Sequence, residues 1–206
     1  REFQKTGPIS FIPNHLGKGF KDKLWAIRRR SPERPIVYAI QVSPMDEHGY
    51  FTTGTVGMSN RMMVENADIV ILEIDENMPR TFGKTYIHVS EATCVYQGAN
   101  EMFYMPERPQ SELDLKIGQF VADLIEDEST LQLGIGGIPN AVAVALRDKH
   151  NLGVHTEMLS DSLIDLYRAG VVTTSAKTLH KDKMVTAFSF GSKAAYDFLD
   201  NNPNVL

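Results

Sequence analysis

The chain has 206 residues, of which 42% are hydrophobic and 23% charged, and its formal net charge is -5. This composition is ordinary for a soluble globular protein, and the length allows one large domain or two small ones. The single cysteine, Cys94, excludes an internal disulfide framework, so we expect a reducing, cytoplasmic location. The longest basic block is residues 28–30, and no apolar run approaches about 18 residues, so we expect neither nucleic acid nor a membrane as a partner.

The first half of the chain carries the pattern of an α/β sheet. Segments rich in Ile and Val and bounded by Pro, Asp or Gly predict strands at residues 8–13, 35–42 and 67–74. Their apolar character on both faces indicates strands that are covered on both sides. Residues 21–30 predict a short helix, and residues 46–49 predict a turn with Gly49 in a special backbone conformation.

A boundary is expected at residues 99–110, where Pro106 and Pro109 interrupt the pattern. The elements expected beyond it are a helix at 113–125, a strand at 129–133, a turn at 134–139, a helix at 140–149, a strand at 154–158 and a helix from Ser160 or Asp161 to about Ala169, ended by Gly170. Helix and strand alternate, as in an α/β layer. The chain begins with Arg1 and stops at Leu206 without a terminal pattern, so we expect a fragment.

The segment LQLGIGGIP at residues 131–139 is the strongest local signal. Its three glycines permit a sharp turn and close approach to a ligand, and Pro139 suits the first turn of a helix. Exposed N–H groups at that helix start can hold an anion, either a phosphate or a developing oxyanion. A tight strand-to-helix turn without a ligand explains the pattern equally well. The segment matches neither a Walker A loop nor GxGxxG.

Glu157 lies near the end of a predicted strand, one strand after the glycine segment. Carboxyl ends of neighbouring strands in an open α/β sheet share a crevice that binds ligands, so both features are expected at one site. A carboxylate there can act as a nucleophile, a general base or a metal ligand, or it is simply solvated. His155 alternates with Glu157 and is expected to point the same way. The spacing of His, Cys, Asp and Glu predicts no metal site.

Six segments in order resemble the acetyl-CoA hydrolase/transferase family, and in particular its 4-hydroxybutyrate and butyrate:acetate CoA-transferases. They are VSPMDEHGYFTTG (42–54), ADIVILEIDENMPRTFG (67–83), IHVSE (87–91), LQLGIGGIPNAV (131–142), LGVHTEMLSD (152–161) and SFGSKAAYDFLDNNP (189–203). The resemblance covers nearly the whole chain. It departs at Ser162, where the family commonly has Gly, and in the drift of residues 91–100.

The resemblance implies a CoA-transferase-like fold of two related α/β domains, with active sites between them and assembly into homo-oligomers. Residues 1–108 are then the later part of the first domain, and residues 109–206 are the early part of the second. Members of the family are about twice this length and carry a downstream GGQ-type segment and a further CoA-binding position. Each domain is therefore expected to be only partly present.

The resemblance also implies roles for particular residues. It makes Glu157 the catalytic nucleophile and places CoA contacts at Gly134, Ile135, Gly136, Gly137 and Ile138. Gln132 is a candidate polar neighbour of the reacting groups in the mechanism that we expect. The implied reaction moves CoA between a short-chain acyl-CoA and a free carboxylate, such as acetate, butyrate or 4-hydroxybutyrate, through a glutamyl-CoA thioester. CoA is a substrate there, and no tightly bound cofactor is expected. The alternatives are an acyl-CoA hydrolase, or a catalytically incomplete fragment that binds CoA or another anion.

Overall fold

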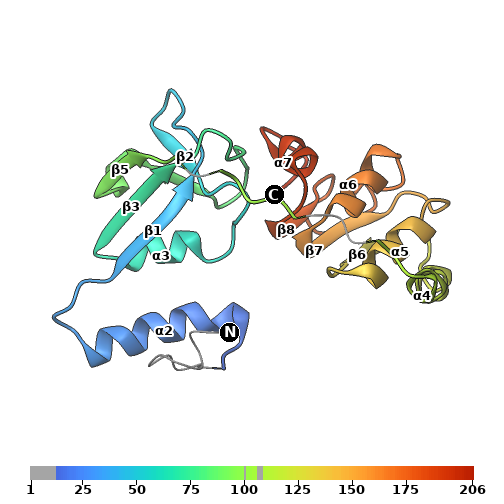
Figure 1. Ribbon diagram of the computed structural model, residues 1–206, viewed down its shortest axis with the longest axis horizontal. Coiled ribbons are helices and arrows are strands. Elements are labelled where there is room, and N and C mark those ends of the chain that lie inside the picture. The colour runs from blue at the N-terminus through green and yellow to red at the C-terminus, as the bar shows by residue number, and fades with distance from the viewer. Residues whose placement is uncertain (1–12, 100, 106–108) are drawn as a thin grey trace.

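A parallel sheet forms the centre of each half of the chain, and the strands β1 (Val37–Val42) and β3 (Ile69–Ile74) of the first half are rich in Ile and Val. The computed structural model describes residues 13–99, 101–105 and 109–206, and it shows two lobes joined by an extended connection (Figure 1). Of the strand predicted at residues 8–13, all but Pro13 lies outside the described residues.

The first lobe contains a parallel sheet in the order β1-β3-β5. The strands are β1 (Val37–Val42), β3 (Ile69–Ile74) and β5 (Cys94–Gln97). The other elements are the helices α2 (Leu16–Arg30) and α3 (Asn60–Asn66), the antiparallel pair β2 (Tyr50–Thr52) and β4 (Tyr86–His88), and the 3₁₀ turn η1 (Val89–Glu91). The core of this lobe consists of Val42, Phe51, Val64, Val70, Leu72 and Ile87.

The second lobe contains a parallel sheet in the order β6-β7-β8. The strands are β6 (Thr130–Leu131), β7 (Gly153–Leu159) and β8 (Val185–Ser189). The helices are α4 (Glu112–Asp123), α5 (Gly137–Ala145), α6 (Asp161–Arg168) and α7 (Lys193–Leu199). Since each strand lies beside the next one in sequence, right-handed crossovers put α5 and α6 on the same face of the sheet. Figure 1 shows α6 and α7 above these strands.

The two faces of this second sheet differ in burial. The face under the helices, here called the covered face, carries the buried side chains of Leu131, Val154 and Met158. The opposite face, here called the open face, carries Gln132, His155 and Glu157, whose side chains are exposed. The alternation follows from the two-residue period of a strand.

Most of the longer predicted elements are confirmed. The strands predicted at 35–42, 67–74 and 154–158 correspond to β1, β3 and β7. The turn predicted at 134–139 is wrong in its second half, because α5 already begins at Gly137 and Pro139 lies in its first turn. The helix predicted at 21–30 is longer, since α2 starts at Leu16. Gly170 does follow the end of α6, with a φ of 77°.

The lobes join through backbone hydrogen bonds at the edge of β8. Gly57 N–H donates to Ala187 O at 2.9 Å, and Ser189 N–H donates to Thr55 O at 2.8 Å. Residues 55–57 of the first lobe therefore extend the sheet of the second lobe by one edge. A second contact between the lobes joins Arg80 of the first to Asp200 of the second: the backbone N–H of Arg80 donates to Asp200 Oδ1 at 2.7 Å.

Helices α4 and α5 approach each other unusually closely at a glycine. A Cβ built on Gly118 would lie 2.6 Å from the backbone carbon of Ala141, a separation that real side chains do not tolerate. Gly118, Ala122 and Ala141 are all buried at this contact. The position of α5, and with it the glycine segment at its start, therefore depends on the missing side chain of Gly118.

We predict that Gly118→Ala lowers the free energy of unfolding by about 1–3 kcal/mol because the added methyl group overpacks the helix contact. Urea unfolding measures the change. The matched control is Lys116→Ala on the exposed side of the same helix, which leaves stability within about 0.5 kcal/mol of the starting value. Since alanine favours helices over glycine by about 1 kcal/mol, a stabilised Gly118→Ala variant contradicts the close contact.

Candidate active site

Glu157 lies in β7, the central strand of the second sheet, and its side chain is exposed on the open face. Thr156 pairs with Thr186, and Met158 pairs with Phe188 in β8, so Ala187 lies beside Glu157. The Thr186 hydroxyl donates to the backbone oxygen of Glu157 at 3.2 Å, which ties the two strands together at this point. The carboxylate thus projects from a backbone that is held by its pairing with β8.

The glycine segment begins on the other side of Glu157. Leu131 of β6 pairs with Val154, and the Thr156 hydroxyl donates to Leu133 O at 3.1 Å, so the strands continue side by side beyond β6. Continuing that register places Gly134 alongside Glu157 on the open face. A Cβ on Gly134 would meet only Pro139 Cγ, at 3.8 Å, so the space above Gly134 is open. In this register Glu157 and the start of the glycine segment are neighbours on the open face.

Two glycines of the segment have structural explanations of their own. Gly136 is the residue before α5, and its φ of 120° and ψ of -174° favour glycine. A Cβ on Gly137 would lie 2.5 Å from Asp114 Oδ2 in α4. The N–H and the hydroxyl of Ser111 bond to the Asp114 carboxylate and lower its pKa. A charged carboxylate therefore already lies close to the start of α5.

Ile135 and Ile138 expose apolar side chains, with 61% and 41% of their surface accessible. Ile135 and Gly136 also line a cavity of about 340 Å³ together with Asn140, Met158, Ser160, Asp161, Ser162 and other residues. Glu157 does not line this cavity, whereas its neighbour Met158, on the covered face, does. The glycine segment thus borders this cavity through Ile135 and Gly136, and Gly134 at its start lies beside Glu157.

Ser162, where the sequence departs from the family pattern, is part of this cavity. Its hydroxyl lies 2.9 Å from the hydroxyl of Ser160 and donates to Asn140 Oδ1 at 3.3 Å. Asp161 accepts hydrogen bonds from the N–H and the hydroxyl of Ser192. The polar groups at the end of β7 are therefore held in place by one another.

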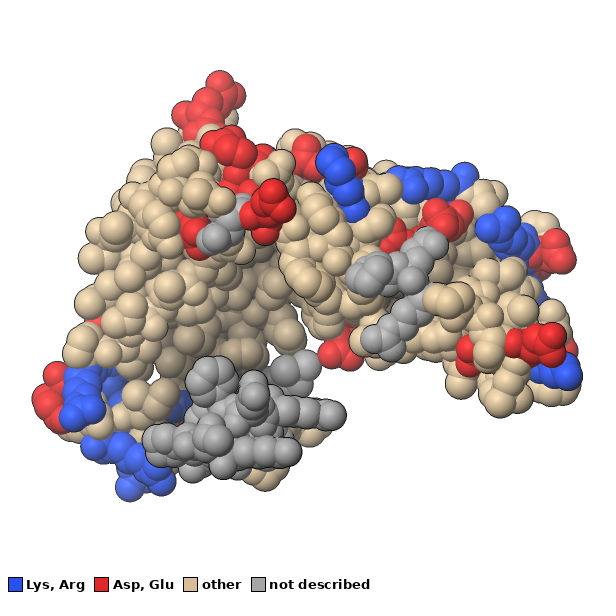
Figure 2. Space-filling model, viewed as in Figure 1, with Lys and Arg blue, Asp and Glu red and all other residues tan. Residues whose placement is uncertain are grey.

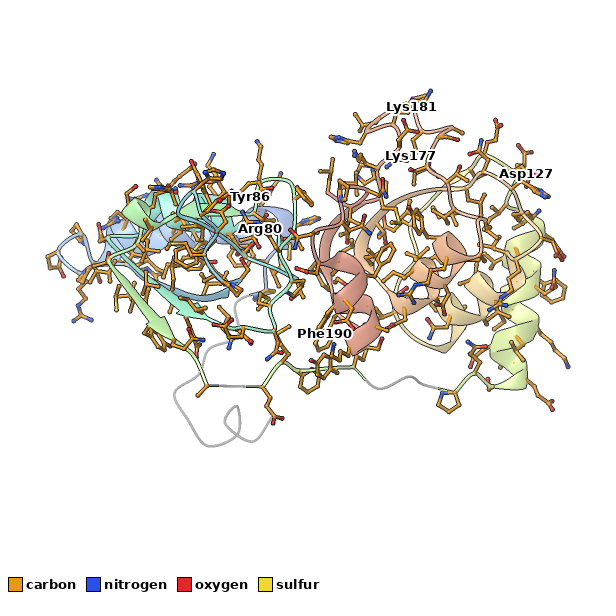
Figure 3. The ribbon with its side chains drawn as sticks, turned by 90° about the horizontal axis from the view of Figure 1, so that it is seen from above. Arg80, Tyr86, Asp127, Lys177, Lys181 and Phe190 are labelled. Carbon is orange, nitrogen blue, oxygen red and sulfur yellow. The ribbon has the colours of Figure 1, made fainter. Side chains whose placement is uncertain are left out.

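The connection between the lobes lies against the carboxyl end of this sheet. Met102 packs against the core of the second lobe, and the ring of Phe103 stacks on Phe190 with 5.2 Å between the centroids. Met105 N–H donates to Gly191 O at 2.9 Å. Tyr196 donates to Phe103 O at 3.0 Å, and burial raises the pKa of its hydroxyl. Figure 3 shows Phe190 at this side of the second lobe.

A second cavity, of about 540 Å³, lies between the lobes. Asp46 pairs there with Arg80, and the pKa of Asp46 is lowered first by the N–H of Tyr50 and also by Arg80. Lys193 of α7 pairs with Asp197 at 2.7 Å, which raises the pKa of the lysine. The cations Arg80 and Lys193 are thus each already paired with a carboxylate of the chain. Neither is a free positive charge that could bind an anionic ligand in this cavity. Figure 3 shows Arg80 and Tyr86 on the side of the first lobe that faces the second.

Lys177 is a buried cation that the sequence did not single out. Its Nζ donates to Val154 O at 2.8 Å and to Lys183 O at 2.6 Å, and burial lowers its pKa. Val154 lies in the first half of β7, and Figure 3 shows Lys177 and Lys181 on the opposite side of the second lobe from Phe190. Lys177 therefore connects backbone segments at the amino end of the sheet, away from the carboxyl end of β7.

Within residues 13–99, 101–105 and 109–206, no group of three or more His, Cys, Asp or Glu side chains is placed to hold a metal ion. In the same ranges, no helix is both long and apolar enough to cross a membrane. Figure 2 shows acidic and basic side chains scattered over one face, with basic ones near the C-terminal end of α2.

Comparisons with known proteins agree on one family. A model of the family described as "Acetyl-CoA hydrolase/transferase N-terminal domain" matches residues 1–131. The chain is 43% identical over 169 residues to the 4-hydroxybutyrate coenzyme A transferase of Clostridium kluyveri, covering 82% of this chain and 39% of that protein. It is 38% identical to the butyryl-CoA:acetate CoA-transferase of Anaerostipes caccae, covering 82% of this chain and 40% of that one.

Solved structures give the same result. A 4-hydroxybutyrate CoA-transferase from Porphyromonas gingivalis superposes with a TM-score of 0.84 and 36% identity, covering 98% of this chain and 50% of that chain. RipA from Yersinia pestis gives a TM-score of 0.90 and 31% identity, covering 98% of this chain and 46% of that chain. The chain thus spans about half the length, or less, of the relatives it matches.

We predict that Gly136→Ala lowers the free energy of unfolding by about 1–3 kcal/mol, because alanine is strained at a φ of 120°. Gly134→Ala is the matched control: its added Cβ meets only Pro139 Cγ at 3.8 Å, so stability stays within about 0.5 kcal/mol. Urea unfolding of both variants measures the two free energies of unfolding. Equal stability of the two variants contradicts this conformation of the glycine segment.

Proposed function

The chain belongs to the acetyl-CoA hydrolase/transferase family, and from this premise we propose that the protein is a CoA-transferase with Glu157 as its nucleophile. It moves CoA between a short-chain acyl-CoA and a free carboxylate. The observation that carries the proposal is an exposed carboxylate on the central strand beside an open glycine segment. The relatives named 4-hydroxybutyrate and butyryl-CoA:acetate CoA-transferases support the class of reaction.

The proposed cycle begins when the Glu157 carboxylate attacks the thioester carbonyl of the acyl-CoA. The carbon–sulfur bond breaks, giving an acyl-glutamyl anhydride and the CoA thiolate. The thiolate then attacks the glutamyl carbonyl of the anhydride, which releases the first carboxylic acid as its anion and leaves a glutamyl-CoA thioester. A second carboxylate then attacks the glutamyl-CoA thioester, which gives a new anhydride and the CoA thiolate. The thiolate attacks the acyl carbonyl of this anhydride, which releases the new acyl-CoA and restores the Glu157 carboxylate. The kinetics are therefore ping-pong.

A carboxylate is a weak nucleophile, so the fold must supply position and charge stabilisation. Glu157 projects from a strand that is hydrogen-bonded to its neighbour through Thr186. Backbone N–H groups of the glycine segment are proposed to face the oxyanion of the tetrahedral intermediate. Each well-placed donor contributes about 3–4 kcal/mol to transition-state stabilisation.

The glycine segment is also the proposed contact for CoA. Gly134 leaves open space beside Glu157, and Ile135 and Ile138 offer exposed apolar surface to the non-polar part of CoA. Gly136 and Gly137 hold the segment in its conformation. Gln132, exposed on the same open face, is a polar neighbour of the reacting groups.

The wider setting of this chemistry is proposed from the resemblance. Residues 1–108 are taken as the later part of a first CoA-transferase domain, and residues 109–206 as the early part of a second. We propose that the protein is a cytoplasmic homo-oligomer that uses acyl-CoA and small carboxylates as substrates and binds no cofactor tightly. Acetate, butyrate and 4-hydroxybutyrate are the proposed acids.

Hydrolysis of acyl-CoA is the second candidate, favoured by one observation. The Glu157 side chain is exposed, so water has access to any intermediate formed on it unless another part of the protein covers the open face. Product analysis separates the two activities. A transferase needs an acceptor acid for turnover and forms a new acyl-CoA, whereas a hydrolase releases CoA without one.

We predict that Glu157→Gln in the full-length protein lowers CoA exchange by at least about 10³-fold, because the amide removes the nucleophile. Binding of CoA stays within a few-fold, since the glycine segment is unchanged; exchange is followed by chromatography of the acyl-CoA products and binding by calorimetry. The matched control is Glu126→Gln, an exposed glutamate outside β7, which retains activity. Near-normal exchange by Glu157→Gln rules out the assignment.

A further inference from the structure

The side of Glu157 opposite the glycine segment is formed by β8. Ala187 lies directly beside Glu157, because the residues on either side of it pair with Thr156 and Met158. Parallel neighbours in register point to the same face of a sheet, so the methyl group of Ala187 lies on the open face with the Glu157 carboxylate. Ala187 is half-buried.

The chain segment on the far side of β8 from Glu157 belongs to the first lobe. Val56 and Phe188 form an antiparallel bridge, and Gly57 N–H donates to Ala187 O at 2.9 Å. Residues opposite each other in an antiparallel pair share a face, and Phe188 shares the covered face with Met158. Gly57, one residue on from Val56, therefore lies on the open face beyond Ala187.

The direction of the acyl group follows from the geometry of a thioester. The carbonyl carbon carries the CoA sulfur on one side and the acyl chain on the other. If the glycine segment takes CoA on the β6 side of Glu157, the acyl chain extends to the β8 side. Strands lie about 4.8 Å apart, so the chain crosses Ala187 first and reaches Gly57 about 10 Å from the backbone of Glu157.

We propose that Ala187 and Gly57 set the length of the acyl chain that the protein accepts, with Gly57 contributed by the first lobe. This inference rests on the proposed function, because it assumes that the Glu157 carboxylate attacks the thioester carbonyl of the acyl-CoA. Larger side chains at the two positions would fill the space over β8. The hydrogen bonds between the lobes thus bring a specificity-determining residue to a nucleophile 100 residues later in the chain.

Gly57 accepts a larger residue without disturbing the fold. A Cβ on Gly57 would meet Ala187 O at 3.4 Å and Thr85 Cγ2 at 3.6 Å, close to ordinary contact distances. Gly57 is not among the glycines with positive φ, so an L-residue fits its backbone. Val185 provides a matched control, because it lies on the same strand and the same face but beside His155.

The test compares Ala187→Val, Gly57→Ala and the control Val185→Ile with the unchanged full-length protein. The quantity measured is kcat/KM for acetyl-CoA, butyryl-CoA and hexanoyl-CoA with propionate as acceptor. Ala187→Val is expected to lower the butyryl-to-acetyl ratio about tenfold or more, since pockets discriminate methylene groups by roughly 10–200-fold. Gly57→Ala is expected to lower the hexanoyl-to-butyryl ratio, and Val185→Ile leaves both ratios unchanged.

A Glu157→Gln arm and thermal unfolding of every variant separate the outcomes. If Glu157→Gln keeps its exchange activity, the proposed function is wrong and this inference fails with it. If Glu157→Gln is inactive but Ala187→Val and Gly57→Ala leave the ratios unchanged, only the inference is wrong. An equal change of the ratios in folded Val185→Ile also overturns it, because the effect would not depend on the positions in line with Glu157.

Discussion

The structure of the second lobe depends on the placement of its helices on one face of the sheet. Strands β6, β7 and β8 follow one another in sequence and in space, so right-handed crossovers carry α5 and α6 to the same side. The alternation along β7 then buries Thr156 and Met158 beneath the helices and leaves His155 and Glu157 on the open face. A carboxylate in the central strand is accessible for this reason alone.

The glycine segment shows how packing and proposed chemistry require the same residues. Gly118 lets α4 approach α5, and Gly137 lets the start of α5 pass Asp114. These contacts fix where the segment leaves β6, and Gly134 is left with open space beside Glu157. Gly137 is therefore explained by packing, whereas only Gly134 borders the proposed reaction space without a packing requirement.

The sequence predicts the parts of the fold that repeat a local pattern. β1 and β3 are mostly apolar, whereas β7 alternates buried and exposed residues, and both patterns predict strands. The pattern of β7 also predicts that Glu157 lies near the end of its strand. β2 and β4 have three residues each, too few to show alternation. Residues 52–57, TTGTVG, have the composition of a turn, yet 55–57 pair with β8 because of a partner more than 100 residues away. Ala187 and Gly57 carry no chemical group that could have drawn notice.

The central claim is that Glu157 carries CoA during turnover. The most direct measurement incubates the full-length protein with butyryl-CoA, quenches it, and analyses the peptide containing Glu157 by mass spectrometry, with and without borohydride. The account predicts CoA linked to Glu157, and the corresponding alcohol after borohydride reduction of the thioester. An unmodified Glu157 peptide from protein that is turning over substrate would contradict it.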